Sequence, residues 1–182
     1  MDQRWQSEFL HRMRAFEATR APREGEASVS LKVRVVSGCF HREHSPHAYA
    51  LIDNFLASHL SRPAEFTFVD HESGPELLIF VAAGIALAKS VIDLVTAIIK
   101  ARSEGIKNGD RPSGSLEVVV RRVGGGDKYA EEVVIRVEHA DPVNTEEIEA
   151  RINSALKRLV EDQMAKKATR ATKRARPRLR RG

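Results

Sequence analysis

The sequence has one cysteine, few aromatic residues and no acidic residue after position 165. The single cysteine, Cys39, excludes an internal disulfide framework and favours a reducing, cytoplasmic compartment. Charged residues recur every few positions near the N-terminus, so we expect no secretory signal peptide there. With 182 residues, 42% of them hydrophobic, the chain is long enough for one globular domain with a true core.

Charge is distributed unevenly along the chain. The whole sequence carries a formal net charge of +5, and residues 166–182 contain nine basic residues and no acid, which leaves −4 for residues 1–165. Such a tail cannot bury a core and binds polyanions through counterion release. We expect largely sequence-independent nucleic-acid binding, because the tail has no aromatic residue to stack on a base; acidic lipid or protein and a purely solubilising role are the alternatives. The cationic residues are Lys166, Lys167, Arg170, Lys173, Arg174, Arg176, Arg178, Arg180 and Arg181.

The hydrophobic pattern predicts an α/β (α+β) fold. Helical spacing marks an amphipathic helix within residues 1–20, and alternation marks strands at 28–36, 65–69, 116–123 and 132–137. Helices are expected at 45–60, at 77–102 and after Asn144. The order β-α-β-α-β-β-α predicts a small mixed sheet of about four strands, the first three nearly parallel and the last an antiparallel edge. We assign residues 28–165 to one domain and residues 166–182 to a disordered tail.

Residues 77–102 form the longest apolar stretch and predict one long central helix around which the others pack. Ser73 is its expected N-cap, and Lys89 and Asp93 are spaced to pair on one face. A membrane-inserted helix over residues 77–99 is an alternative, but charges at the centre of a bilayer cost roughly 2.5–3.5 kcal/mol each on insertion scales. We therefore expect a core helix; a helix that forms a homo-oligomer is a third possibility.

The loop after the first strand is rich in metal-ligand residue types. Cys39, His41, His44 and His47 match the donors of a tetrahedral zinc site. Four donors within nine residues leave the loop little scope to wrap one ion, and no familiar spacing is present. We expect no cofactor, with zinc as the alternative.

A second polar cluster follows the strand at 65–69. His71 and Glu72 are candidates for a site on the rim of the sheet, which could include Cys39 and His41 if the first two strands are neighbours. Residues 124–128 combine three glycines with Asp and Lys, but a strand follows them, so they indicate a hairpin tip rather than a phosphate loop.

These observations predict a small cytoplasmic binding or interaction module with a polyanion-binding tail, more consistent with a non-enzyme than with an enzyme. Nucleic acid or another polyanion is the expected partner, with a protein partner or a second copy of the chain as further possibilities. One alternative is a small metal-dependent enzyme that uses the Cys39/His41/His44/His47 loop. The other is a membrane-associated protein inserted through residues 77–99.

Overall fold

A computed structural model describes residues 3–20, 22–59, 66–82, 86–124, 128–138 and 142–159. The basic tail predicted from the sequence lies outside these residues. The elements are α1 (Gln3–Thr19), β1 (Glu26–Val35), α2 (Pro46–His59), β2 (Phe66–Val69), β3 (Glu76–Ala82), α3 (Lys89–Lys107), β4 (Leu116–Gly124) and β5 (Lys128–Val137). A further helix covers residues 145–159, and the side chain of Asn144 accepts the backbone N–H of Glu147 at its start, as predicted.

The strands form one five-stranded antiparallel sheet in the order β2-β3-β1-β4-β5. The prediction of about four strands, the first three nearly parallel, is wrong. A strand that the sequence did not predict, β3, lies between β1 and β2 and pairs antiparallel with both. On its other side β1 pairs antiparallel with β4. The predicted antiparallel edge strand, β5, is confirmed.

The prediction of one helix over residues 77–102 is wrong in its first part. Residues Glu76–Ala82 form β3, and α3 begins only at Lys89. A short continuous apolar run fits a strand buried on both faces as well as a buried helix, and periodicity cannot separate the two. Ser73 therefore precedes a strand and caps no helix. No helix within the described ranges is long and apolar enough to cross a membrane.

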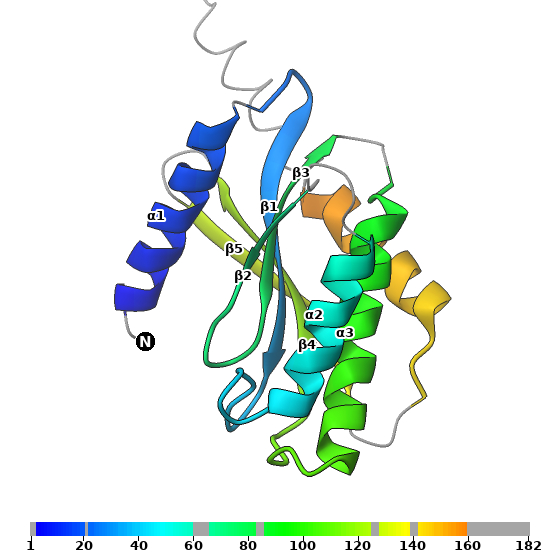
Figure 1. Ribbon diagram of the computed structural model, residues 1–182. Helices are drawn as coiled ribbons and strands as arrows, with labels where there is room; N and C mark the ends of the chain where they lie inside the picture. The colour runs from blue at the N-terminus through cyan, green and yellow to red at the C-terminus, as the bar shows by residue number, and fades with distance from the viewer. Residues whose placement is uncertain are drawn as a thin grey trace, which may run out of the picture.

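The main core lies between one face of the sheet and three helices. Figure 1 shows α2, α3 and the orange helix of residues 145–159 together on this side. Alternate residues of β1 face them, including Val29, Leu31 and Val33, each fully buried. Ile92 and Ile98 contribute to the same cluster from α3. The predicted pair between Lys89 and Asp93 is confirmed, with Nζ and Oδ1 2.9 Å apart.

The opposite face of the sheet is covered by α1 (Figure 1). The predicted amphipathic helix, α1, packs on the sheet through its apolar stripe: Phe9, Met13 and Phe16 are buried, and the Phe16 ring stacks on Phe80 at 4.4 Å between centroids. The alternation of apolar and polar residues in β1 predicts a strand with one exposed face, and this prediction is wrong because α1 covers that face (Figure 1). Its polar residues Ser30 and Lys32 lie beneath α1, with 0% and 3% of their surface exposed.

The β4–β5 hairpin differs from the sequence pattern in one detail. Its register shifts between Val118 and Val119, where Ile135 and Val133 are their respective partners. An extra residue in one strand of an antiparallel pair moves the following side chains to the other face. Val133 is consequently 46% exposed, although its spacing placed it with Ile135 and Val137. Residues 125–127, at the predicted hairpin tip, lie outside the described part of the chain.

Candidate functional site

The loop between β1 and α2 is fixed by backbone hydrogen bonds at both ends. The N–H of Phe40 donates to the carbonyl of Glu72 at 2.8 Å, and the Phe40 side chain is fully buried. Five residues later, the N–H of Ser45 donates to the carbonyl of His41 at 2.8 Å, which closes a tight turn before α2. The turn brings residues 41 and 44 to the same side of the loop.

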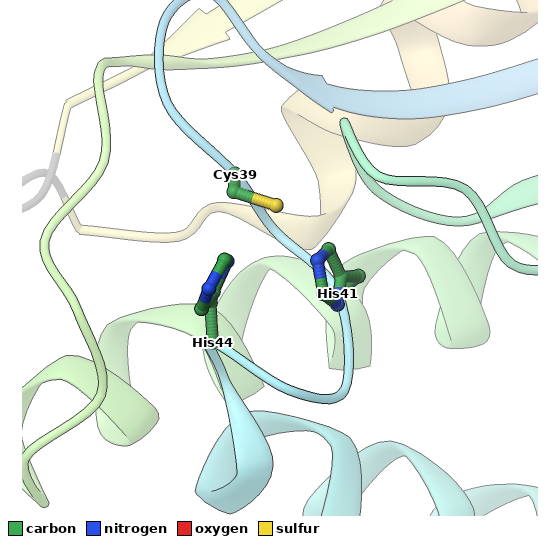
Figure 2. A group of neighbouring side chains, drawn as sticks. All are labelled: Cys39, His41 and His44. Carbon is green, nitrogen blue, oxygen red and sulfur yellow. The ribbon is translucent and has the colours of Figure 1, made fainter.

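Three predicted ligands converge in this loop. One ligand atom each from Cys39, His41 and His44 lies within 4.8 Å of the other two, and all three residues are partly buried. Figure 2 shows the three side chains gathered on the segment that leads into α2. The two imidazole rings are 4.7 Å apart between centroids. The turn at residues 41–45 therefore brings three of the four predicted ligand residues close together in spite of their compact spacing.

The thiol and the imidazole nitrogens of this cluster form few hydrogen bonds within the described part of the protein. The Cys39 thiol donates to the carbonyl of Glu72 at 3.1 Å, and the Nδ1 of His41 accepts the N–H of Glu43 at 3.1 Å. The Nδ1 of His44 is buried and has no hydrogen-bond partner among the described residues. Burial, followed by the charges of Glu72 and Glu43, raises the pKa of the Cys39 thiol. The thiol therefore carries its proton at neutral pH.

The fourth predicted ligand, His47, is directed elsewhere. Its Nδ1 lies 2.8 Å from Oδ1 of Asp110, and its side chain is 55% exposed. The same carboxylate accepts the backbone N–H groups of His47 at 3.1 Å and Ala48 at 2.9 Å. Asp110 thus satisfies the first turn of α2 from a position 62 residues further along the chain than Ala48, a role that local sequence patterns cannot reveal.

The two candidates on the rim of the sheet lie in different surroundings: Glu72 contacts the Cys39 loop, and His71 contacts Glu76. The backbone of Glu72 contacts the Cys39 loop, because β3 is the neighbour of β1 and its first residues meet the end of β1. The ring of His71 instead contacts Glu76, with Nε2 2.7 Å from Oε2. The four-residue combination of Cys39, His41, His71 and Glu72 is therefore not assembled as one set of side chains.

A buried polar network lies under α1. Alternating polar residues were the only sign of it in the sequence. The carboxylate of Glu76 is fully buried, contacts His71 and accepts a hydrogen bond from Ser30. Arg12 and Arg121 pair with its two oxygens at 3.3 and 3.1 Å. Burial alone would raise the pKa of Glu76. The hydrogen bond with His71, followed by the charge of Arg121, the hydrogen bond from Ser30 and the charge of Lys32, outweighs burial and lowers the pKa to about 2.

Lys32 lies beside this carboxylate. Its Nζ donates to the carbonyl of Gly74 at 2.5 Å. Burial lowers the pKa of Lys32 to about 7; the charge of Glu76 opposes this shift, and the charges of Arg121, Arg12 and Arg34 reinforce it. A lysine that titrates near neutral pH in a partly open pocket is a candidate functional group.

Comparison with known proteins identified no relative of this chain. No protein-family model, curated protein or solved structure matches the chain. The functional assignment therefore rests on the geometry of the two sites and on the charge distribution of the sequence.

Proposed function

We propose that the protein is a small binding module that holds a divalent transition metal, zinc by its donor chemistry, through Cys39, His41 and His44. The observation that carries this proposal is the convergence of one thiol and two imidazoles within 4.8 Å. In a tetrahedral zinc site the ligand atoms lie roughly 3.3–3.8 Å apart, given Zn–S of about 2.3 Å and Zn–N of about 2.0–2.1 Å. Small side-chain rotations close the remaining gap.

Metal binding would replace weak hydrogen bonds of Cys39 and His41 with stronger metal–ligand bonds. A histidine that ligates through Nε2 carries its proton on Nδ1, so His41 gives up the bond from the Glu43 N–H. Cys39 gives up its bond to the Glu72 carbonyl as the thiol loses its proton. Sulfur together with imidazole nitrogen favours zinc over magnesium or calcium. A cytoplasmic location belongs to the same proposal, since the thiolate has to stay reduced to act as a ligand.

Three protein ligands leave the fourth position open. Structural zinc sites have four protein ligands, whereas catalytic sites keep one position for water or substrate. The metal-dependent enzyme considered from the sequence would use this position to activate water. A binding module would use it to accept a ligand atom from a partner. We favour the binding module, and a cobalt spectrum that changes on addition of free imidazole would demonstrate the open position.

The metal proposal is tested on full-length protein purified without an affinity tag. We expect about one zinc per chain by elemental analysis, and a cobalt-substituted form with a sulfur-to-cobalt charge-transfer band that Cys39→Ser abolishes. His44→Ala should release the metal. His47→Ala is the matched control, because it removes a neighbouring histidine, in the first turn of α2, that contacts Asp110. The proposed site would be rejected if the protein held no stoichiometric metal, or if His47→Ala lost as much metal as His44→Ala.

A second candidate activity rests on the charge split of the sequence, −4 in residues 1–165 against +9 in residues 166–182. We propose that the tail binds nucleic acid without sequence preference. If five to seven cations meet phosphates, log affinity should fall with log salt with a slope of about −4.5 to −6 on duplex DNA. Truncation after Ala165 should abolish this binding and leave the thermal transition nearly unchanged. Unaltered DNA binding by the truncated chain would refute the proposal.

A further inference from the structure

The structure contains a pocket that includes none of Cys39, His41 and His44, and we call it the α1 pocket. It has a volume of about 450 Å³ and lies between α1, the sheet and the loop that precedes β3. Four of its lining residues come from four different places in the chain: Arg12 in α1, Lys32 in β1, His71 in the loop and Arg121 in β4. Trp5, the only tryptophan of the sequence, also lines it.

The inner wall of the α1 pocket has more positive than negative groups. Arg12, Lys32 and Arg121 surround one buried carboxylate, Glu76. The hydrogen-bond acceptor of Lys32 is the neutral carbonyl of Gly74. The remaining lining carboxylates, Glu8 and Glu72, belong to exposed residues, where water screens their charge. With Lys32 protonated, the inner wall therefore carries a net positive charge.

Two guanidinium nitrogens of this wall lack partners. The Nε atoms of Arg12 and Arg121 are buried and have no hydrogen-bond partner among the described residues. Arg121 as a whole is only 6% exposed. Buried donors on charged groups are costly to leave unsatisfied, so such atoms indicate a missing acceptor. An oxyanion supplies several acceptors at once, and arginine is the side chain best suited to bind one.

We propose that the α1 pocket binds a small tetrahedral oxyanion, of the phosphate or sulfate class, either free or as the terminal group of a small molecule. Arg12 and Lys32 are its principal ligands, and Arg121 contributes from the floor of the pocket. Glu76 positions both arginines through its ion pairs. The α1 helix closes the site, because it supplies both Arg12 and Trp5.

Anion binding is expected to be coupled to the protonation of Lys32. Lys32 faces Arg12 from α1, Glu76 from β3 and Arg121 from β4, with Arg34 on its own strand. His71 and Glu8 line the same pocket. An added anion stabilises the charged amine, so affinity should increase as the pH falls through neutrality. Sulfate is the suitable probe because, unlike phosphate, it does not change charge in this range.

The test uses the fluorescence of Trp5 in the full-length protein. Sulfate is titrated at constant ionic strength, with chloride as the replacement ion, in the presence and absence of a zinc chelator. The chelator arm separates this site from the metal proposal. We expect a saturable response at pH 6.5 that weakens at pH 8.5. Arg12→Gln and Lys32→Met should each lower the affinity at least tenfold. Lys32→Met should fold at least as well as the parent chain, since it removes a buried charge.

Arg20→Gln is the matched control, because it removes an arginine of α1's C-terminal flank that packs on Phe80 away from this pocket. Its sulfate affinity should equal that of the parent. Because all of these variants keep the basic tail, a loss of affinity in Arg12→Gln and Lys32→Met excludes the tail as the source of the signal. A phosphate monoester that binds more tightly than inorganic phosphate would assign a phosphorylated small molecule, and equal affinities would assign the free ion. No saturable response, or an unchanged affinity in Lys32→Met, would overturn the proposal.

Discussion

At the scale of single residues, Gly74 connects the Cys39 loop with the α1 pocket. Its carbonyl accepts the Lys32 amine, and its N–H donates to the carbonyl of His71. Its φ of +128° belongs to glycine rather than to L-residues with a side chain. A Cβ here would lie 2.1 Å from the carbonyl oxygen of Val33 and 3.1 Å from the ring of Phe40.

Gly74→Ala is therefore expected to lower the free energy of unfolding by about 3 kcal/mol or more, because backbone strain adds to a clash with backbone. Chemical denaturation monitored by circular dichroism measures the change. Gly109→Ala is the control: Gly109 has a φ of +105° with nothing within 4 Å of the added Cβ. It should lose only about 1 kcal/mol. Equal losses at both positions would show that the close approach at Gly74 is unimportant.

At the scale of elements, α3 shows how the main core is stabilised. Its buried face runs from Val91 to Gly105, and its first polar pair, Lys89 with Asp93, faces solvent. Glycine at position 105 allows α2 to approach, since a Cβ there would lie 2.8 Å from the Cβ of Ala48. The helix thus has a buried side against the sheet and α2, as expected for an amphipathic helix.

Ile92→Ala should destabilise the protein by about 2–5 kcal/mol, because Ile92 is fully buried in the main core and its truncation leaves a cavity. Leu51→Ala on α2 is the control, since Leu51 is 43% exposed. Its loss should stay below about 1 kcal/mol. Urea denaturation of both variants checks the difference. A loss below about 1 kcal/mol in Ile92→Ala would contradict the burial of this face.

At the scale of the whole molecule, the sheet separates two environments. One face packs against three helices through apolar side chains, and the other carries charged residues beneath α1. Glu76 and Lys32 on the second face both have lowered pKa values, to about 2 and about 7. Their effects on stability fall in different pH ranges, so they can be measured separately.

Glu76 stabilises the fold fully above its ordinary pKa of 4.5, and we expect this contribution, on the order of 3 kcal/mol, to be lost as the pH falls toward 2. Lys32 acts in the opposite sense. Between its folded pKa of about 7 and its ordinary 10.5, the unfolded chain binds a proton that the folded chain does not, so stability should rise with pH across this window.

Denaturation curves at a series of pH values test both effects. Glu76→Gln should be less stable than the parent at neutral pH, since it leaves the buried Arg121 and the partly buried Arg12 without their carboxylate. It should not lose further stability as the pH falls toward 2. In Lys32→Met, the free energy of unfolding should not rise above pH 7 as it does in the parent. The difference between each variant and the parent isolates one group from the other titrations. A rise of the same slope in Lys32→Met would disprove the assignment to Lys32.

Much of the secondary structure followed from local patterns. The stripe of Phe9, Met13 and Phe16 predicted α1, the alternation in residues 28–36 predicted β1, and Asn144 with Glu147 predicted the start of the last helix. The ligand types at Cys39, His41 and His44 were also visible. These features depend on residues close together in the chain, where spacing alone decides which side chains share a face.

Only the tertiary structure determined the features that depend on residues far apart in the sequence. Residues 76–82 form a strand because β1 and β2 pair with them on both sides. An apolar run in the sequence does not distinguish a buried strand from a buried helix. Lys32 became a buried group because α1 covers a face that alternation assigned to solvent. The α1 pocket is lined by residues 12, 32, 71 and 121, and His47 contacts Asp110 instead of the other three predicted ligands. Hydrogen bonds, ion pairs and burial between such residues form only once the sheet has been assembled, and no local spacing records them.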